Sequence, residues 1–257
     1  LIVHVPDLAA AQTLAALPDA ALAMAEAFWP GPLTLVAPLR TRAPVCELAT
    51  AGLPTVALRV PAHPLALALL RATGAPVVAP SANPSGAVSP TQAFHVLEGL
   101  AGRIAGVLDG GACAVGLEST IIGFADGGPT LLRPGGLDIG MAETILGTAL
   151  RRPDPAGSVT APGMLSSHYA PGALLRIEAA APRPGEAWLG FGPDAVEPSA
   201  HALSLSEKGD LTEAAAHLFG HLRQLDKALG HRGTIAVAPI PETGLGIAIN
   251  DRLRRAA

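Results

Sequence analysis

Short apolar runs alternate with helical patterns along the first part of the chain. Runs rich in valine, isoleucine and leucine predict strands at residues 1–5, 33–39, 55–60, 76–79, 104–108, 120–124 and 130–133. The stretches between them predict helices at residues 7–28 with a break at Pro18, 64–72, 90–100 and 139–146. Strands that alternate with helices in this way are typical of an α/β fold, an open twisted sheet with flanking helices.

A second, smaller α/β pattern follows a break in the periodicity. Residues 151–172 are rich in proline, glycine and serine, which predicts a linker between domains. Apolar runs predict strands at residues 173–177, 186–191 and 235–240. Residues 211–229 place apolar side chains on one helical face, with Asp210 as the N-cap and Gly230 as the stop. We therefore expect a larger α/β domain at residues 1–150, the linker at 151–172 and a smaller, Rossmann-like accessory domain at 173–257.

Composition narrows the class of protein. A chain of 257 residues with 49% hydrophobic residues can bury a substantial core. A net charge of −4 and a pI near 6.1 disfavour non-specific nucleic-acid binding, so any link to RNA is expected to be weak and indirect. Two cysteines, Cys46 and Cys113, are too few for a disulfide framework; we expect both to be buried in a cytoplasmic protein. No apolar run reaches the roughly 18 residues of a membrane span, so no membrane association is expected.

Three polar strings interrupt the apolar runs at residues 79–91, 116–120 and 132–136. Their small residues let backbone N–H groups and short side chains approach a ligand closely. Together they carry hydroxyls, an amide and an arginine, which favours a phosphate-handling cleft. Since Lys208 and Lys227 are the only lysines, a nucleotide site in the first domain must rely on arginine.

These strings, with the Phe-Trp-Pro-Gly-Pro-Leu-Thr segment at residues 28–34 and the strand at residues 55–59, resemble the YrdC-type threonylcarbamoyl-AMP synthases in their two-domain form. The resemblance covers essentially the whole chain. It implies a nucleotidyltransferase, an L-threonylcarbamoyladenylate synthase. Such an enzyme joins L-threonine, bicarbonate and ATP into threonylcarbamoyl-AMP and pyrophosphate, with Mg²⁺ expected. The product would pass to the tRNA threonylcarbamoyl transferase machinery, which makes N6-threonylcarbamoyladenosine (t6A37).

The resemblance also implies site residues. On the threonine side these are His4, Arg59, Ala79 through its backbone, and Ser119. On the ATP side they are Thr55, Ser81, Ser89, Arg133 and, from the linker folding over the site, Tyr169; Asn83 is added for its hydrogen-bonding amide. No single catalytic residue and no resident metal are assigned. In-line attack of a carbamate on the α-phosphorus needs positioning and charge neutralisation rather than a protein nucleophile.

Several of these residues also have a purely structural interpretation. His4 could be an ordinary core or edge histidine, and Arg133 a surface arginine at a strand end. Ser89 begins a Ser-Pro-Thr-Gln capping box, so we expect helix capping there before ATP contact. His217 and His221 are four apart on a helix, but no third metal ligand is close in sequence.

Two other functions fit parts of the pattern. The family pattern begins upstream of this chain's first strand with a threonine-containing loop and a Lys-x-x-x-Arg element, so we expect the catalytic domain to be N-terminally incomplete. One alternative is therefore a non-catalytic nucleotide-binding or interaction protein. The other is a carbamoyl-adenylate-forming carbamoyltransferase. Enzymes of that type are larger and carry cysteine-rich zinc modules, so the two cysteines of this chain argue against it.

Overall fold

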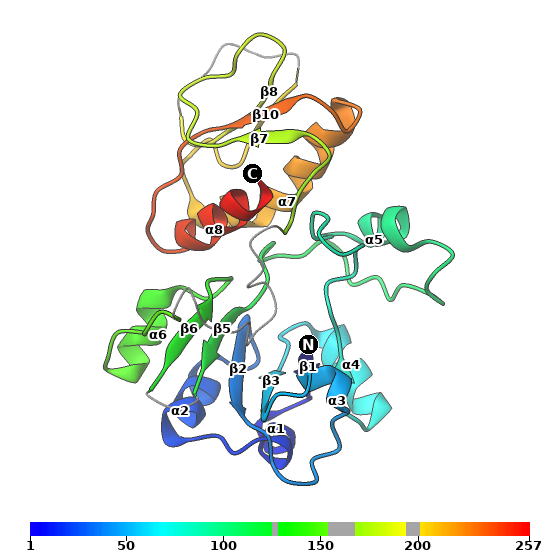
Figure 1. Ribbon diagram of the computed structural model, residues 1–257, viewed down its shortest axis with the longest axis vertical. Helices are drawn as coiled ribbons and strands as arrows, with labels where there is room; N and C mark the ends of the chain where they lie inside the picture. Colours follow the sequence, from blue (N-terminus) through cyan, green and yellow to red (C-terminus); the bar gives the residue numbers. More distant parts are fainter. Residues whose placement is uncertain (125–127, 154–167, 194–200) are drawn as a thin grey trace. The chain divides into compact units, whose positions relative to one another are not determined.

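The computed structural model describes residues 1–124, 128–153, 168–193 and 201–257 (Figure 1). The chain divides into two compact units. The first unit is Leu1–Pro80 with Glu118–Leu165, and the second is Ser81–Leu117 with Ser166–Ala257. Most of the expected linker lies outside the described residues, so the domain boundaries at 150 and 172 stay a prediction. Within the described ranges, no helix has the length and apolar content to cross a membrane.

The first unit is built on a six-stranded mixed sheet in the order β4-β1-β3-β2-β5-β6. Its strands are β1 (Ile2–His4), β2 (Leu33–Pro38), β3 (Thr55–Arg59), β4 (Val77–Val78), β5 (Thr120–Gly123) and β6 (Thr130–Arg133). The β1/β3 and β2/β5 pairs are parallel and the other three pairs are antiparallel. This open sheet confirms the predicted α/β class.

Within the described residues, the first unit has five helices. They are α1 (Leu8–Leu14), α2 (Asp19–Phe28), α3 (Glu47–Thr50), α4 (Pro64–Thr73) and α6 (Ile139–Leu146). The Asp7 carboxylate caps α1 by accepting the N–H of Ala10, and the break predicted at Pro18 separates α1 from α2. Gly74 ends α4 in the left-handed region, as its sequence position predicts.

The two faces of this sheet differ in composition, because successive residues of a strand point to opposite sides. On one face, Val3, Val56 and Leu58 join a core cluster with Leu14 of α1. The opposite face carries a small apolar cluster of Ile2, Val36, Ala57 and Ile121. That second face is the one on which the polar strand-end residues lie.

The second unit holds a four-stranded parallel sheet in the order β7-β10-β8-β9. Its strands are β7 (Leu174–Arg176), β8 (Ala187–Gly190), β9 (Ala202–Ser204) and β10 (Thr234–Val237), and its helices are α5 (Ala93–Leu100), α7 (Leu211–Ala228) and α8 (Gly246–Ala256). Asp210 caps α7 by accepting the N–H groups of Thr212 and Glu213, as predicted. Phe219 and Leu222 of α7 are buried in the main core of this unit.

Two predictions about the segment after α5 are wrong. Residues 104–108 form no strand, and Leu108 is 61% exposed. Gly106 interrupts this run, and glycine adds backbone freedom without a side chain to pack. Cys113 lies in the same exposed segment, and Cys46 is exposed before α3, so neither cysteine is buried as expected.

The predicted capping box is also wrong. Helix α5 begins at Ala93 with Gln92 as its N-cap, so Ser89 lies three residues too early to cap it. The backbone N–H of Thr91 donates to Nδ1 of His95 at 3.2 Å, and the carbonyl of Thr91 accepts the N–H of Cys113 at 2.9 Å. The backbone of Thr91 is thus bound to a side chain of the helix and to a segment 22 residues later, and the second of these contacts is not visible in the local sequence.

Candidate functional site

Strand register gathers several polar residues of the first unit on one face of its sheet. His4 is paired with Arg59 across β1 and β3, and Ile121 is paired with both Thr34 and Arg133 across β2, β5 and β6. The β2/β3 register, continued by one residue, places Thr34 opposite Arg59. These five residues form a line across five strands, which we call the cross-sheet row. With neighbouring strands roughly 4.8 Å apart, the row spans about 19 Å, enough for a small extended ligand.

Arg59 ends β3 and is held by the turn before β2. Its Nε donates to the carbonyl oxygen of Gly31 at 3.1 Å, while the Gly31 N–H donates to the carbonyl of Val60 at 2.9 Å. A Cβ at Gly31 would lie 2.2 Å from the carbonyl oxygen of Phe28, so only glycine fits this turn. The Trp-Pro-Gly-Pro segment therefore serves to orient the Arg59 guanidinium, whose fork geometry suits a carboxylate.

His4 is half-buried beside Arg59. Burial, and then the nearby Arg59 charge, lower the pKa of His4 from 6.5 to about 4. Its Nδ1 is buried and has no hydrogen-bond partner among the described residues. The ring is thus neutral at neutral pH, with an unsatisfied nitrogen in the cross-sheet row. A neutral imidazole in this position can hydrogen-bond a ligand without adding charge.

Ser119 and Arg133 bring the second and third polar strings together. The Arg133 guanidinium donates to the Ser119 carbonyl through Nε at 3.2 Å and Nη2 at 2.9 Å. The Ser119 hydroxyl lies 2.7 Å from that of Thr34. Arg133 is only 5% exposed, so the alternative of an ordinary surface arginine is wrong. A buried cation fixed beside two hydroxyls is suited to neutralise an anionic ligand.

Gly135 allows this close approach. A Cβ there would lie 2.4 Å from the carbonyl oxygen of Glu118 and from the carbonyl carbon of Ser119, and 2.5 Å from the nitrogen of Thr120. The backbone of the Arg-Pro-Gly-Gly string therefore lies directly against that of the Glu-Ser-Thr string. Thr120 adds two bonds to Leu137, its hydroxyl donating to the carbonyl at 2.8 Å and accepting the N–H at 3.0 Å.

Thr55 and Ala79 lie farther along the strands. Thr55 begins β3 four residues before Arg59, on the same face, which corresponds to about 13 Å along the strand. The N–H of Ala79 donates to the carbonyl of Ile2 at 3.2 Å. A backbone contact from Ala79 to a ligand would therefore use its carbonyl oxygen.

The other four predicted residues belong to the second unit. Ser81 is exposed, and Ser89 is 5% exposed. The Asn83 amide nitrogen donates to the carbonyls of Pro84 and Ala87 at 2.8 and 3.1 Å, while its side-chain oxygen is buried and has no partner among the described residues. Asn83 thus shapes its own loop and leaves one acceptor for a ligand.

Tyr169 is packed in the core of the second unit. It is 2% exposed, has a φ of 66° and stacks on Phe219 with the ring centroids 5.6 Å apart. The contact of this ring with ATP stays a prediction. Residues 154–167, which precede it in the predicted linker, lie outside the described residues.

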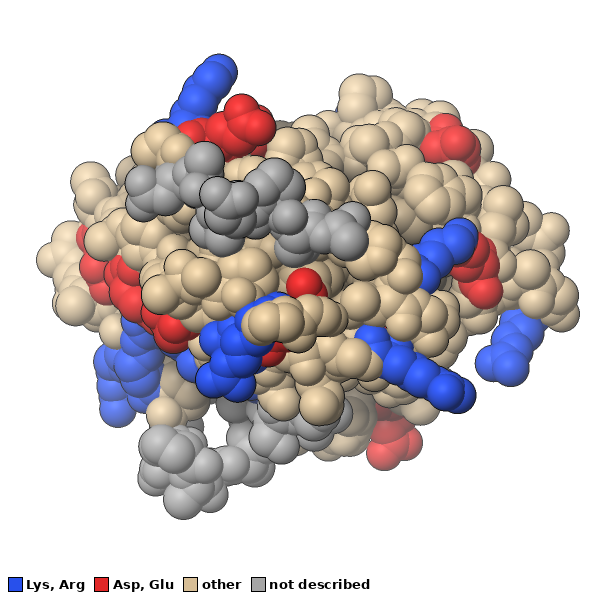
Figure 2. Space-filling model, turned by 90° about the horizontal axis from the view of Figure 1, so that it is seen from above, with Lys and Arg blue, Asp and Glu red and all other residues tan. Residues whose placement is uncertain are grey.

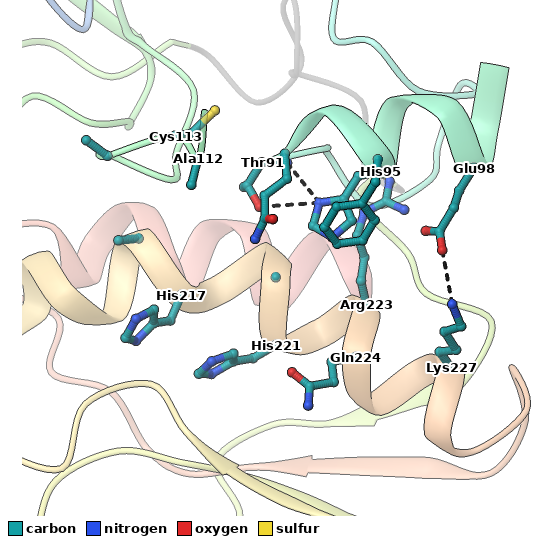
Figure 3. Close-up of a pocket in the computed structure, with 15 residues that line it drawn as sticks. Thr91, His95, Glu98, Ala112, Cys113, His217, His221, Arg223, Gln224 and Lys227 are labelled. Atoms are coloured by element: carbon teal, nitrogen blue, oxygen red, sulfur yellow. Dashed lines mark hydrogen bonds and ion pairs between the residues drawn. The ribbon is translucent and has the colours of Figure 1, made fainter. Parts of the chain in front are cut away.

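A cavity of about 600 Å³ lies in the second unit, between α5, α7 and residues 112–114 (Figure 3). His217 and His221 of α7 stack on its rim with centroids 4.8 Å apart, and Glu98 pairs with Lys227 at 3.1 Å. Across the described ranges, histidine, cysteine and carboxylate side chains form no cluster of three that could hold a metal ion.

Charge on the visible face of the molecule is mixed. In Figure 2, basic and acidic side chains are interspersed, and this face shows no broad basic area. A mixed surface of this kind fits the net charge of −4 and gives little attraction to a nucleic-acid backbone.

Sequence reasoning missed Thr34 and Gly31 as parts of the site. Thr34 is fully buried, yet its hydroxyl meets Ser119 in the row. A threonine in a strand otherwise made of apolar residues was the available signal, since a buried hydroxyl needs a partner.

Two family models together match almost the whole chain. A family model described as telomere recombination matches residues 1–135, and one described as the threonylcarbamoyl-AMP synthase C-terminal domain matches residues 139–257. The threonylcarbamoyl-AMP synthase of Bacillus subtilis (strain 168) is 39% identical over 275 residues, covering 100% of this chain and 79% of the relative. That of Pyrococcus abyssi is 38% identical over 280 residues, with the same coverage of 100% and 79%.

Solved structures agree with these matches. The crystal structure of P. abyssi Sua5 complexed with L-threonine aligns with a TM-score of 0.88 at 36% identity, covering 100% of this chain and 79% of that one. A variant of the P. abyssi protein, with a histidine and the adjacent tyrosine replaced by alanine, aligns with a TM-score of 0.87 at 34% identity, covering 100% and 78%. The chain therefore belongs to the two-domain, YrdC-type threonylcarbamoyl-AMP synthase family.

Proposed function

We propose that this protein is an L-threonylcarbamoyladenylate synthase that converts L-threonine, bicarbonate and ATP into threonylcarbamoyl-AMP and pyrophosphate. The observation that carries the proposal is the cross-sheet row, which places His4, Arg59 and Arg133 on one face beside Ser119. Family membership supports it, because the relatives that span the chain are named for this activity.

In this proposal, the threonine side of the site is the part of the row around Arg59. The Arg59 guanidinium binds the amino-acid carboxylate, and the hydroxyl of Ser119 and the backbone of Ala79 add polar contacts. His4 stays neutral, so it can accept a hydrogen bond without repelling a protonated amine before that amine loses its proton. The neutral amine then takes up carbon dioxide to form a carbamate. The crystallised P. abyssi relative with bound L-threonine supports this assignment.

The nucleotide side uses arginine and small polar groups. Arg133 supplies a buried positive charge for phosphate, and Thr55, Ser81, Asn83, Ser89 and Tyr169 complete the proposed ATP contacts. The carbamate oxygen attacks the α-phosphorus and pyrophosphate leaves, a step that needs alignment and charge neutralisation rather than a covalent protein intermediate. Mg²⁺ would enter with ATP, since it prefers substrate phosphates and water to an all-protein cage.

The proposed partners follow from this chemistry. Threonylcarbamoyl-AMP is an activated acyl adenylate, so a tRNA threonylcarbamoyl transferase must consume it, in the cytoplasm where tRNA is modified. Contact with tRNA itself would be weak, given the acidic net charge.

The deciding experiment measures pyrophosphate release from ATP by the purified chain. We expect release only when L-threonine and bicarbonate are both present. Nucleotide binding without release would favour the non-catalytic alternative. Release supported by carbamoyl phosphate in place of threonine and bicarbonate would favour the carbamoyltransferase.

A further inference from the structure

Helix α8 carries an arginine that is buried in the second unit. The Arg252 side chain is 1% exposed, and its Nη1 donates to the Asp251 carboxylate at 2.7 Å. The carbon at the centre of its guanidinium lies 5.1 Å from the centroid of the Tyr169 ring, a cation–π arrangement. Burying a charge is costly, and an apolar side chain of similar volume often stabilises a core equally well. The presence of a cation here therefore points to a role in placing its neighbours.

Tyr169 needs such support. Its φ of 66° lies in the left-handed region, which a bulky side chain rarely adopts unless its surroundings hold it there. Phe219 stacks on one part of the ring and the guanidinium of Arg252 lies against it. Arg252 is thus one of the groups that hold the Tyr169 backbone in an unfavourable conformation.

The residues next to Tyr169 connect α8 to a predicted nucleotide loop. The His168 N–H donates to the carbonyl of Arg255 in α8 at 3.0 Å. On the other side, the Ala170 N–H donates to the carbonyl of Gly86 at 2.9 Å, and Ala170 forms a β-bridge with Ala87. Residues 81–89 contain three of the side chains that we assign to ATP. The conformation at Tyr169 therefore fixes where α8 and this loop meet.

We propose that Arg252 is a positioning residue for nucleotide binding, which acts by holding Tyr169 and, through Ala170, the loop at residues 81–89. This inference rests on the proposed function, because the loop is assigned to ATP there. It gives the C-terminal domain a specific task, that of setting the shape of the nucleotide loop without touching the reacting atoms.

The kinetic test compares Arg252→Met with Arg254→Met on the same helix. Arg254 is the matched control, since its side chain is 52% exposed and pairs with Glu242. We expect Arg252→Met to raise the KM for ATP roughly tenfold with kcat changed less than about twofold, and Arg252→Lys to restore part of the loss. Arg254→Met should leave both constants unchanged. A purely structural role would lower apparent kcat through loss of folded enzyme and leave KM unchanged, and that result would overturn the proposal.

A second readout needs no catalysis. Tyr169 is the only tyrosine in the chain, so 3-fluorotyrosine gives a single ¹⁹F resonance that reports this ring. We expect the resonance to move in Arg252→Met and to stay in place in Arg254→Met. If the wild-type chain makes no product, titration of this resonance with MgATP replaces KM, so failure of the proposed function is told apart from failure of the inference.

Folding of the variants is followed by circular dichroism. If Arg252→Met does not fold, the KM for ATP and the ¹⁹F resonance are measured on Arg252→Lys instead, since this variant keeps the charge and loses only the planar fork. An unchanged ATP constant together with an unchanged ¹⁹F resonance in the folded variant would overturn the proposal.

Discussion

At the scale of single residues, the site depends on groups whose ionisation and hydrogen bonding are set by their neighbours. His4 and Arg59 are paired across parallel strands, and the cost of burying His4 together with the charge of Arg59 keeps the imidazole neutral. The local sequence indicates only a histidine in an apolar run. Its lowered pKa follows first from burial in the folded sheet and then from the charge of a residue 55 positions away, so no local pattern could have predicted it.

His4 should make the folded protein sensitive to acid. Its pKa is about 4 in the folded state and about 6.5 in the unfolded chain, so between these values the unfolded chain binds more protons. The free energy of unfolding is unaffected by His4 above pH 6.5 and falls as the pH drops toward 4. We expect a loss of roughly 2–3 kcal/mol from this group between pH 7 and pH 4.5.

Urea denaturation at both pH values measures this loss. His4→Gln should remove that part of the pH dependence, while His201→Gln, at an exposed position, should behave like the wild type. An equal acid sensitivity in the wild type and in His4→Gln would show that His4 is not the group responsible.

Arg59 should control threonine affinity. Arg59→Lys keeps the positive charge but loses the planar fork and the Nε bond to Gly31. We expect the KM for L-threonine to rise roughly 10- to 100-fold, the size of one charge-assisted hydrogen bond, with little change in the KM for ATP. Steady-state pyrophosphate release measures both constants, and Arg71→Lys on the exposed side of α4 serves as the control. A rise confined to the KM for ATP would move Arg59 to the nucleotide side.

At the scale of elements, periodicity predicted most strands and helices, and the errors have physical causes. Strands β2, β3 and β5 lie within the apolar runs that predicted them. The helices α1, α2 and α7 begin after Asp7, Pro18 and Asp210, as their local chemistry predicts. The run at residues 104–108 is interrupted by Gly106. Ser89 does not cap α5, because the helix begins at Ala93 and the N–H of Thr91 donates to the ring of His95 instead. In both cases the competing factor is a backbone or tertiary effect that a hydrophobic pattern does not contain.

The cross-sheet row shows the same limit for the site. The polar strings could be recognised one by one. Ser119 and Arg133, from the second and third strings, share a face of the first unit's sheet, whereas the polar side chains of the first string belong to the second unit. The alignment of the row depends on strand order and register, which join β2 to β5 across more than 80 residues of sequence. Thr34 was missed because its role exists only in that register.

The contact between the Arg-Pro-Gly-Gly and Glu-Ser-Thr strings can be tested by one methyl group. In Gly135→Ala, the new Cβ would lie 2.4 Å from backbone atoms of Glu118 and Ser119, so β5 must shift and Ser119 must leave the guanidinium of Arg133. We expect a loss of about 1–3 kcal/mol in the free energy of unfolding and weaker ATP binding. Gly106→Ala is the control, because a Cβ there meets nothing within 4 Å. Equal stability of the two variants in urea would contradict the close contact.

At the scale of the whole molecule, the two compact units do not follow the order of the sequence. Residues 81–117 are near the middle of the chain, yet they pack with the C-terminal part in the second unit. Val88 and Leu117 join its core cluster, and Arg223 of α7 donates to the carbonyls of Val88 and Ser89. The predicted nucleotide loop therefore depends for its order on residues that the sequence places more than 80 positions later.

This dependence predicts the behaviour of a fragment that ends at residue 150. Without α7 and α8, residues 81–117 lose their apolar partners and the bond from Ala170 to Gly86, while the sheet of the first unit keeps its own strand pairs. Hydrogen exchange followed by mass spectrometry should show the amides of residues 93–101 exchanging at least tenfold faster in the fragment than in the full chain, since local opening no longer costs tertiary packing. Peptides from β2 and β3 are the internal control and should exchange at similar rates in both proteins. If residues 93–101 stay as protected in the fragment as in the full chain, α5 is ordered by the first 150 residues alone, and its order does not depend on the C-terminal domain.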